Sequence, residues 1–174
     1  MFHVRQALFT LVLGASAVTS GCATSTPQGS PAPAFSNAVA AYGAAWASRD
    51  VERILALHTD DTEFTLFVDG VETARGRDAV RRQFAWVFET NPTYAGRTVA
   101  VHMTADSATI EYLIAMAPQN PFTPGRWRFT PTGDAYDVRA IDMLYFRDGL
   151  VRALHIYLDA EATRANSAAV AALP

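Results

Sequence analysis

The sequence predicts an α+β fold in which the helices come first and the strands follow. Near the start of the foldable chain, Val39, Tyr42 and Trp46 recur at three- and four-residue spacing, which marks the buried stripe of a helix. Later segments are typical of strands and are separated by turn residues such as Asp106-Ser107 and Asp148-Gly149. Helices followed by antiparallel strands indicate helices packed on one face of a sheet.

Three helices are expected in the first half of the domain. The first carries the Val39, Tyr42 and Trp46 stripe and can be capped by Ser36 or Asn37. Asp50 can cap a short second helix, and the pattern breaks at residues 59–62. The face shared by this second helix consists of Ile54, Leu55 and His58. Gly76 and Asp78 open a third helix that stops before Pro92, and its apolar stripe consists of Val80, Phe84, Val87 and Phe88.

The rest of the domain is expected to be mostly strand. Residues 64–68 precede Asp69-Gly70, a strong hairpin signal, and residues 71–73 follow it. Further strands are predicted at 97–103, 108–117, 135–146 and 150–159. A loop rich in Pro and Gly separates the second and third of these, and residues 126–129 can form a short flap strand within it. The Ala-rich tail from Ala160 is predicted to be a short helix.

The first 22 residues differ in composition from the rest of the chain. Arg5 precedes an apolar run at residues 7–18, and its length of roughly 12 residues suits a signal peptide and is too short to span a bilayer. Thr19-Ser20-Gly21-Cys22 resembles a lipobox, which implies cleavage before Cys22 and lipidation of that residue. The alternative is an ordinary secretory signal with a chance cysteine. Cys22 is the only cysteine, so a disulfide framework is excluded.

These observations divide the chain into three parts. We expect a lipoprotein signal peptide at 1–21, a flexible Ser/Thr/Pro/Gly/Ala-rich tether at 22–34, and one domain at 35–172. The protein would be exported to the cell envelope and anchored to a membrane through Cys22. Ala23, in place of Asp after the cysteine, favours the outer membrane in a Gram-negative cell. A net charge of −3 and scattered arginines argue against nucleic acid as a partner.

Segments spread over the domain carry a resemblance to a known superfamily. They are residues 41–50, 54–61, 76–80 and 141–151. In this order they resemble the nuclear transport factor 2 / SnoaL / ketosteroid isomerase superfamily. The resemblance implies a curved antiparallel sheet wrapped around the N-terminal helices to form a conical cavity, the cystatin-like roll. The superfamily mixes enzymes, binding modules and assembly domains, so the activity stays open.

The resemblance also implies candidate site residues. Ketosteroid isomerases use a tyrosine on the first helix, a base carboxylate on the first strand and a protonated aspartate on the penultimate strand. In this sequence those positions are Tyr42, Leu66 and Asp142. Leucine cannot transfer a proton, so the steroid isomerase mechanism is not expected. SnoaL-type cyclases use an acidic base deeper in the cone, a role open to Asp142.

Asp142 is singled out by periodicity as well as by resemblance. It interrupts an otherwise apolar row formed by Val138, Ala140, Leu144 and Phe146. A buried carboxylate is costly unless its pKa rises or a specific donor reaches it, so such a group in a cavity is a functional candidate. The alternative is a structural aspartate that a neighbouring group satisfies.

Tyr42 and His58 join Asp142 as candidate catalytic residues. The hydroxyl of Tyr42 needs a partner if buried, and His58 could act as a base near neutral pH. For both, an ordinary core role is the alternative. The expected ligand-lining residues are Trp46, Phe64, Leu66, Phe84, Tyr112, Leu144 and Phe146. His155 and Glu111 have the opposite strand parity and should point away from the cone.

No metal site or cofactor is expected. The histidines of the domain are His58, His102 and His155, and they form no spaced pair on one helix. The sequence also has no Gly-rich phosphate loop and no nucleophile elbow.

The other face of the penultimate predicted strand is apolar as well. Ile141, Met143 and Tyr145 form it, and a strand that is apolar on both faces is covered on both faces. We therefore predict a homodimer through this face.

Three functions remain open. The leading one is a domain that binds a small, mostly apolar molecule in its cone, with Asp142 and Tyr42 orienting a carbonyl or hydroxyl. The second is a cofactor-free isomerase, cyclase or lyase on a ring ketone that uses Asp142 with Tyr42. The third is a structural envelope protein whose cone is filled by side chains.

Overall fold

The computed structural model of the chain describes residues 33–68 and 71–173. The predicted signal peptide, Cys22 and the Asp69-Gly70 turn lie outside the described residues. The first helix starts at Pro33, inside the segment predicted to be a tether. Within the described ranges, no helix is long and apolar enough to cross a membrane.

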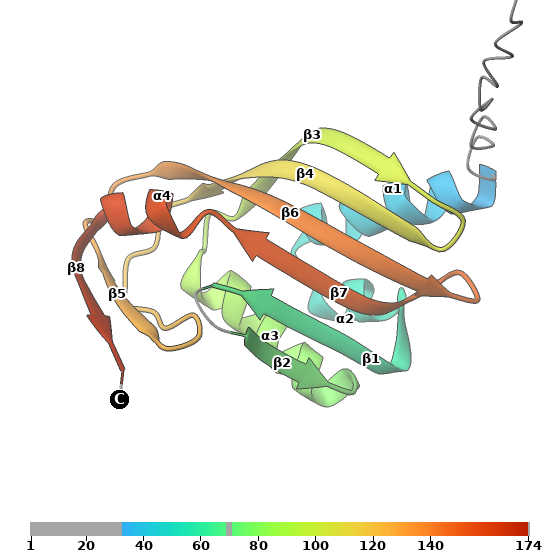
Figure 1. Ribbon diagram of the computed structural model, residues 1–174, viewed down its shortest axis with the longest axis horizontal. Coiled ribbons are helices and arrows are strands. Elements are labelled where there is room, and N and C mark those ends of the chain that lie inside the picture. The colour runs from blue at the N-terminus through green and yellow to red at the C-terminus, as the bar shows by residue number, and fades with distance from the viewer. Residues whose placement is uncertain (1–32, 69–70, 174) are drawn as a thin grey trace, which may run out of the picture.

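Four helices and eight strands make up the described chain (Figure 1). The helices are α1 (Pro33–Ser48), α2 (Val51–Leu55), α3 (Arg77–Thr90) and α4 (Ala160–Ala165). The strands are β1 (His58–Phe67), β2 (Val71–Arg75), β3 (Ala95–Met103), β4 (Ser107–Met116), β5 (Trp127–Pro131), β6 (Tyr136–Arg147), β7 (Leu150–Leu158) and β8 (Ser167–Ala172). The α+β class is thereby confirmed.

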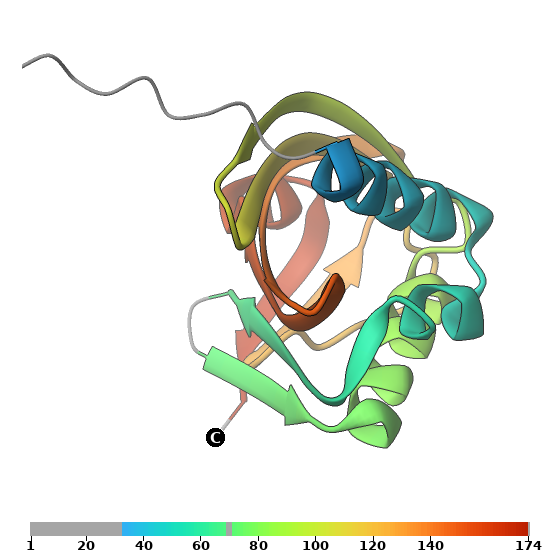
Figure 2. The same ribbon diagram turned by 90° about the vertical axis from the view of Figure 1, so that its right-hand side faces the viewer.

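Six strands form one curved sheet in the order β2-β1-β7-β6-β4-β3. Figure 2 shows the sheet curling, with α1 beside its β3–β4 end and α3 beside β1 and β2. Neighbouring strands are antiparallel except β1 and β7, which are parallel. The sheet is therefore mixed, whereas the sequence predicted a wholly antiparallel one. A second sheet, β5 with β8, lies at one end of the molecule (Figure 1).

Local sequence explains where the helices begin. The side chain of Asp50 accepts hydrogen bonds from the backbone N–H groups of Glu52 and Arg53, so the predicted cap of α2 is confirmed. Asp159 caps α4 in the same way. Gly76 precedes α3 with a φ of 79°, a left-handed conformation that glycine adopts without strain.

The core lies between the helices and the concave face of the sheet. Val80, Phe84 and Phe88 of α3 are buried, as predicted from their spacing. The ring of Phe84 meets Trp46 at 5.1 Å and Phe64 at 5.7 Å between centroids, both edge to face. Aromatic pairs of this geometry add to the hydrophobic gain from their burial, so α1, α3 and β1 are held together at this point.

Two predicted segments differ from the structure. His58 does not end the second helix; it begins β1, and residues 59–62 continue that strand up to a register shift before Glu63. The tail is helical only as far as Ala165, after which residues 167–172 form β8 and pair with β5. Alanine favours helix, but the backbone hydrogen bonds offered by the edge of β5 outweigh that propensity.

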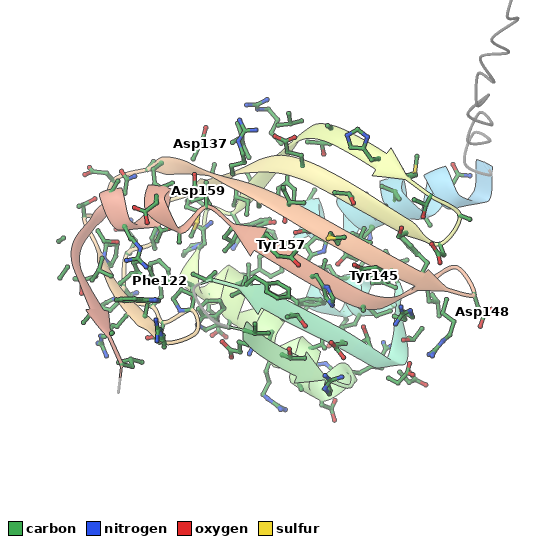
Figure 3. All side chains as sticks on the ribbon, viewed as in Figure 1. Phe122, Asp137, Tyr145, Asp148, Tyr157 and Asp159 are labelled. Carbon is green, nitrogen blue, oxygen red and sulfur yellow. The ribbon has the colours of Figure 1, made fainter. Side chains whose placement is uncertain are left out.

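The convex face of the sheet is rich in aromatic side chains. Figure 3 shows Tyr145 and Tyr157 on this face, which points away from the helices. Ile141 is 39% exposed and Tyr157 is 41% exposed, and the Tyr157 ring stacks on Phe67 at 4.4 Å. His155 contacts the rings of Phe67 and Tyr145, so it points away from the cone as its parity predicted.

Candidate functional site

A cavity of about 470 Å³ separates α1 from strands β3, β4 and β6. Its volume falls in the range of small-molecule sites, roughly 300–1,000 Å³. The wall is mostly apolar and aromatic. It consists of Val39, Ala40, Tyr42, Gly43, Trp46 and Ala47 of α1, Tyr94, Gly96, Thr98, Val101 and Met103 in or just before β3, Ile110 and Tyr112 of β4, and Asp142 of β6.

Asp142 is the only formally charged side chain among the described residues that line this cavity. It is 5% exposed, and the same face of β6 carries the buried residues Val138, Ala140 and Leu144. Its cross-strand partners are Ile110 on β4 and Ile156 on β7. The alternation of β6 therefore places this carboxyl group inside the cone, as the sequence pattern predicted.

Tyr112 is the hydrogen-bond partner of this carboxyl group. It pairs with Ala140 in the register of β4 and β6, two residues from Asp142 on the same face. Its hydroxyl donates a buried hydrogen bond of 2.7 Å to Oδ1 of Asp142. Burial raises the pKa of Asp142 from 3.8 to about 7, and the Tyr112 hydrogen bond holds it from rising further. Both protonation states are therefore populated near neutral pH.

Two further tyrosines lie near the same carboxyl group. Burial and the charge of Asp142 raise the pKa of Tyr42 and the pKa of Tyr94 above the usual value of 10. The hydroxyl of Tyr42 and the indole N–H of Trp46 approach each other but form no hydrogen bond of normal geometry. Tyr94 was not predicted as a site residue, because it lies in the turn between α3 and β3, where no periodicity marks its orientation.

His58 lies in the core and does not line this cavity. It is 1% exposed, and its Nδ1 is 2.8 Å from the hydroxyl of Thr62. That hydroxyl also lies 3.4 Å from the carbonyl oxygen of Val151, and Nε2 of His58 has no hydrogen-bond partner among the described residues. Burial, with the charge of Arg77, lowers the pKa of His58 to about 3. His58 is therefore neutral at physiological pH and packs against the ring of Tyr42 at 5.6 Å.

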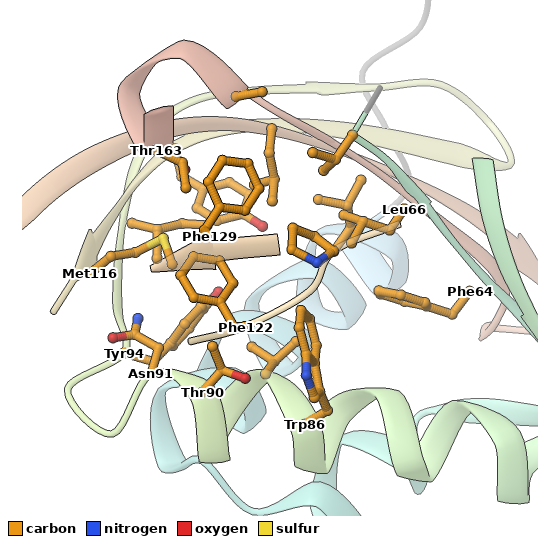
Figure 4. Close-up of a pocket in the computed structure, with 18 of the residues that line it drawn as sticks. Phe64, Leu66, Trp86, Thr90, Asn91, Tyr94, Met116, Phe122, Phe129 and Thr163 are labelled. Carbon is orange, nitrogen blue, oxygen red and sulfur yellow. The ribbon is translucent and has the colours of Figure 1, made fainter. Parts of the chain in front are cut away.

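A second, narrower cavity of about 80 Å³ lies under the β5–β8 end of the cone (Figure 4). Phe122 and Phe129 stack there at 5.4 Å between centroids, and Trp86 of α3 faces them across the cavity. Both cavities are lined by Trp46, Tyr94 and Tyr112, so these rings form the wall between them. The cone is thus divided into a larger chamber with the carboxyl group and a small apolar one.

The expected ligand-lining residues distribute unevenly between these chambers. Trp46 and Tyr112 line both, whereas Phe64 and Leu66 line only the apolar one. Phe84 and Leu144 are fully buried in the core and line neither, and Phe146 is half-buried against the core. Leu66 therefore faces a different chamber from the one that Asp142 lines.

No group of three or more histidine, cysteine, aspartate or glutamate side chains is placed to hold a metal ion within residues 33–68 and 71–173.

The raised pKa of Asp142 predicts a pH-dependent stability. Asp142 keeps its proton up to about pH 7 in the folded state, whereas in the unfolded chain it loses the proton near pH 4. Between these values the folded state binds more protons, so the free energy of unfolding falls as the pH rises. Relative to that of Asp142→Asn, we expect the free energy of unfolding of wild type to fall by roughly 2–4 kcal/mol between pH 4 and pH 8. Urea unfolding of both proteins across this range measures it.

Asp137→Asn, at an exposed position on the same strand, is the matched control, and its stability should change with pH as that of wild type does. A difference between wild type and Asp142→Asn that stays constant with pH would show that the carboxyl group titrates normally.

Comparisons with known proteins agree with this geometry. No curated protein matches the sequence. A candidate SnoaL-like polyketide cyclase from Jannaschia sp. CCS1 has a similar structure, with a TM-score of 0.67, 17% identity, and coverage of 78% of this chain and 92% of that one. A protein from Catenulispora acidiphila DSM 44928, with a ketosteroid isomerase-like fold and solved with trimethylamine, gives a TM-score of 0.61, 18% identity, and 79% and 93% coverage.

A third similar structure is an NTF2-like protein of unknown function from Burkholderia pseudomallei K96243. Its TM-score is 0.64 at 14% identity, with coverage of 79% of this chain and 100% of that one. At these identities the likeness establishes the fold. The family model of the SnoaL-like domain matches residues 39–154, which is more than half of the sequence. The chain therefore belongs to the SnoaL-like domain family, within the NTF2-like fold.

Proposed function

We propose that this protein is an exported, lipid-anchored lipoprotein that binds a small, mostly apolar molecule in the chamber containing Asp142. One observation carries the binding part of this proposal: an apolar cavity of about 470 Å³ is lined by a single carboxyl group, that of Asp142, which accepts a hydrogen bond from Tyr112. Pockets built for small molecules have this composition, with many apolar contacts and few polar groups that orient the ligand.

The chamber argues against the structural alternative. A cone filled by side chains would leave no space of this size, because protein interiors are close-packed. Helix α1 lies across the cavity from β3. Small residues line both sides of this space, among them Ala40 and Gly43 on α1 and Gly96 on β3. A Cβ at Gly43 would meet no atom within 4 Å.

The carboxyl group can meet a polar ligand atom in either protonation state. When protonated, Asp142 donates a hydrogen bond to a carbonyl oxygen; when ionised, it accepts one from a hydroxyl or N–H group. Since the pKa of Asp142 is about 7, both states cost little near neutral pH. A bound ligand then stabilises the protonation state to which it binds more tightly.

A thermal-shift screen tests the binding proposal. The purified chain is mixed with steroids, phenolic ketones, polyketide-like rings and fatty acids. A ligand at 100 times its Kd adds about 2.7 kcal/mol, which moves the midpoint of a domain of this size by several degrees. We expect a hit whose shift is lost in Asp142→Asn and kept in Asp137→Asn. Hits that Asp142→Asn leaves unchanged would place the ligand elsewhere.

A cofactor-free isomerase, cyclase or lyase is the second candidate, and the pKa of Asp142 near 7 favours it. A carboxyl group of this pKa can take a proton from a ring ketone and return it at neutral pH. Each ketone hit is therefore incubated with enzyme and followed for product. Loss of turnover in folded Asp142→Asn supports this function, and unchanged turnover removes Asp142 from the chemistry.

The lipid anchor rests on the sequence at Cys22. In a bacterial host, wild type should accumulate in the membrane fraction and take up labelled palmitate, because acyl chains at the cysteine hold the mature protein to the bilayer. Cys22→Ser should lose the label and leave the membrane fraction, whereas Ser25→Ala should behave as wild type. Wild type in the soluble periplasm would indicate an ordinary secretory signal.

We also propose a homodimer through the convex face of the sheet, whose exposed members include Ile141 and Tyr157. Light scattering should give about twice the mass of one chain. Tyr157→Glu should give the monomer mass, because it puts a charge into an apolar contact. Arg82→Glu, at an exposed position on α3, is the matched control. A monomer mass for wild type would contradict the proposed dimer.

A further inference from the structure

The chamber around Asp142 combines one carboxyl group with four aromatic side chains. Tyr42 and Trp46 come from α1, Tyr94 lies just before β3, and Tyr112 comes from β4. The Trp46 ring is 5.8 Å from that of Tyr94 and 6.3 Å from that of Tyr42. Trp46 therefore contacts two of the other rings, and all four aromatic side chains line the chamber beside the carboxyl group.

No described positive charge lines this chamber. The sequence of α1 contains no charged residue. On the strands, Arg97 pairs with Leu113 and His102 pairs with Thr109, at register positions on the convex side of the sheet. Arg139 forms an ion pair with Glu111 on that same side. An ionised Asp142 thus has a hydrogen bond from Tyr112 but no counter-ion among the described residues.

Such a carboxylate can be stabilised by a proton or by a cation that the ligand brings. Aromatic faces attract cations, and the attraction grows when the pair is removed from water. An anionic ligand would instead face a like charge in a low dielectric. We infer that this chamber binds an organic ammonium ion: a protonated amine with apolar substituents, whose N–H donates to Asp142 and whose alkyl groups rest against the aromatic rings. The inference rests on the proposed function and specifies its polar group.

The space between α1 and β3 leaves room for such a ligand. A Cβ added at Gly96 would lie 3.6 Å from the Tyr112 ring, so the glycine keeps the space beside that ring open. Gly43 and Ala40 are exposed on the opposite side of this gap. A cyclic or branched amine can therefore reach the carboxyl group between α1 and β3.

The titratable groups that face the carboxyl group are Tyr42, Tyr94 and Tyr112, whose pKa values are all raised by burial and by the charge of Asp142. The three tyrosine side chains therefore stay neutral between pH 6 and pH 8. Amine binding should therefore strengthen as the pH rises through the pKa of Asp142, about 7, because the bound cation requires the carboxylate.

Three probes of the same shape and different charge test the inference. They are N,N-dimethylcyclohexylamine (a cation), cyclohexyl methyl ketone (neutral) and cyclohexanecarboxylate (an anion). Titrations of the full chain at pH 8, followed by NMR, give each Kd. We expect the amine to bind at least about tenfold more tightly than the ketone, with the carboxylate weakest.

Variants locate the effect. In Asp142→Asn, the Kd of the amine should come within about threefold of the Kd of the ketone. The rise of amine affinity between pH 6 and pH 8 should also disappear. Tyr94→Leu should weaken amine binding about fivefold more than Tyr94→Phe does, because Tyr94→Phe retains the aromatic ring. The Tyr94 pair and the three wild-type titrations decide the matter even if Asp142→Asn folds poorly.

The outcomes separate the inference from the proposed function. If the ketone binds as tightly as the amine, the ammonium inference fails, while the proposal of a small-molecule site stands. If none of the three probes binds and the wider thermal-shift panel also gives no hit, both fail.

Discussion

The carboxyl group of Asp142 and its hydrogen bond from Tyr112 set the character of this molecule. The pair joins adjacent strands β4 and β6 on the concave face of the sheet, where the neighbouring side chains are apolar. Burying one carboxyl group costs several kcal/mol unless a partner offsets the cost, and a single neutral hydroxyl offsets only part of it. A residue that made only this contact would serve the fold less well than an apolar side chain that fills the space.

Tyr112 also takes part in dividing the cone. Trp46, Tyr94 and Tyr112 separate the chamber of Asp142 from the smaller chamber beneath Phe122 and Phe129. Leu66 lines that smaller chamber, whose polar boundary is limited to groups such as Thr90 and Asn91. A carboxylate in place of Leu66 would therefore face mainly apolar groups, on the far side of the aromatic wall from Asp142. The leucine is consistent with a chamber that excludes water.

The sequence could predict what depends on periodicity. The inward position of Asp142, the cap at Asp50 and the buried stripe of α3 each follow from alternation, helical spacing or local hydrogen bonding. The role of Tyr112 as the donor to Asp142 depends on the register of β4 against β6, which no local pattern specifies. Tyr94 comes from a turn, so its place in the wall could be recognised only after the chain had folded. The pairing of β5 with β8 is likewise non-local, and it overrides the helical propensity of the alanines.

The electrostatics also limit the chemistry that this fold can carry here. Mechanisms that move a proton between two positions commonly divide the work between two titratable groups with different pKa values. His58 is neutral and lies outside the chamber, and the tyrosines around Asp142 hold their protons more tightly than usual. Among the described lining residues, only Asp142 titrates near neutral pH. One carboxyl group must therefore both take and return the proton in any isomerisation, whereas a bound cation needs only its charge. For this reason binding makes the smaller demand on the site, and a bound cation also gains from the aromatic rings beside Asp142.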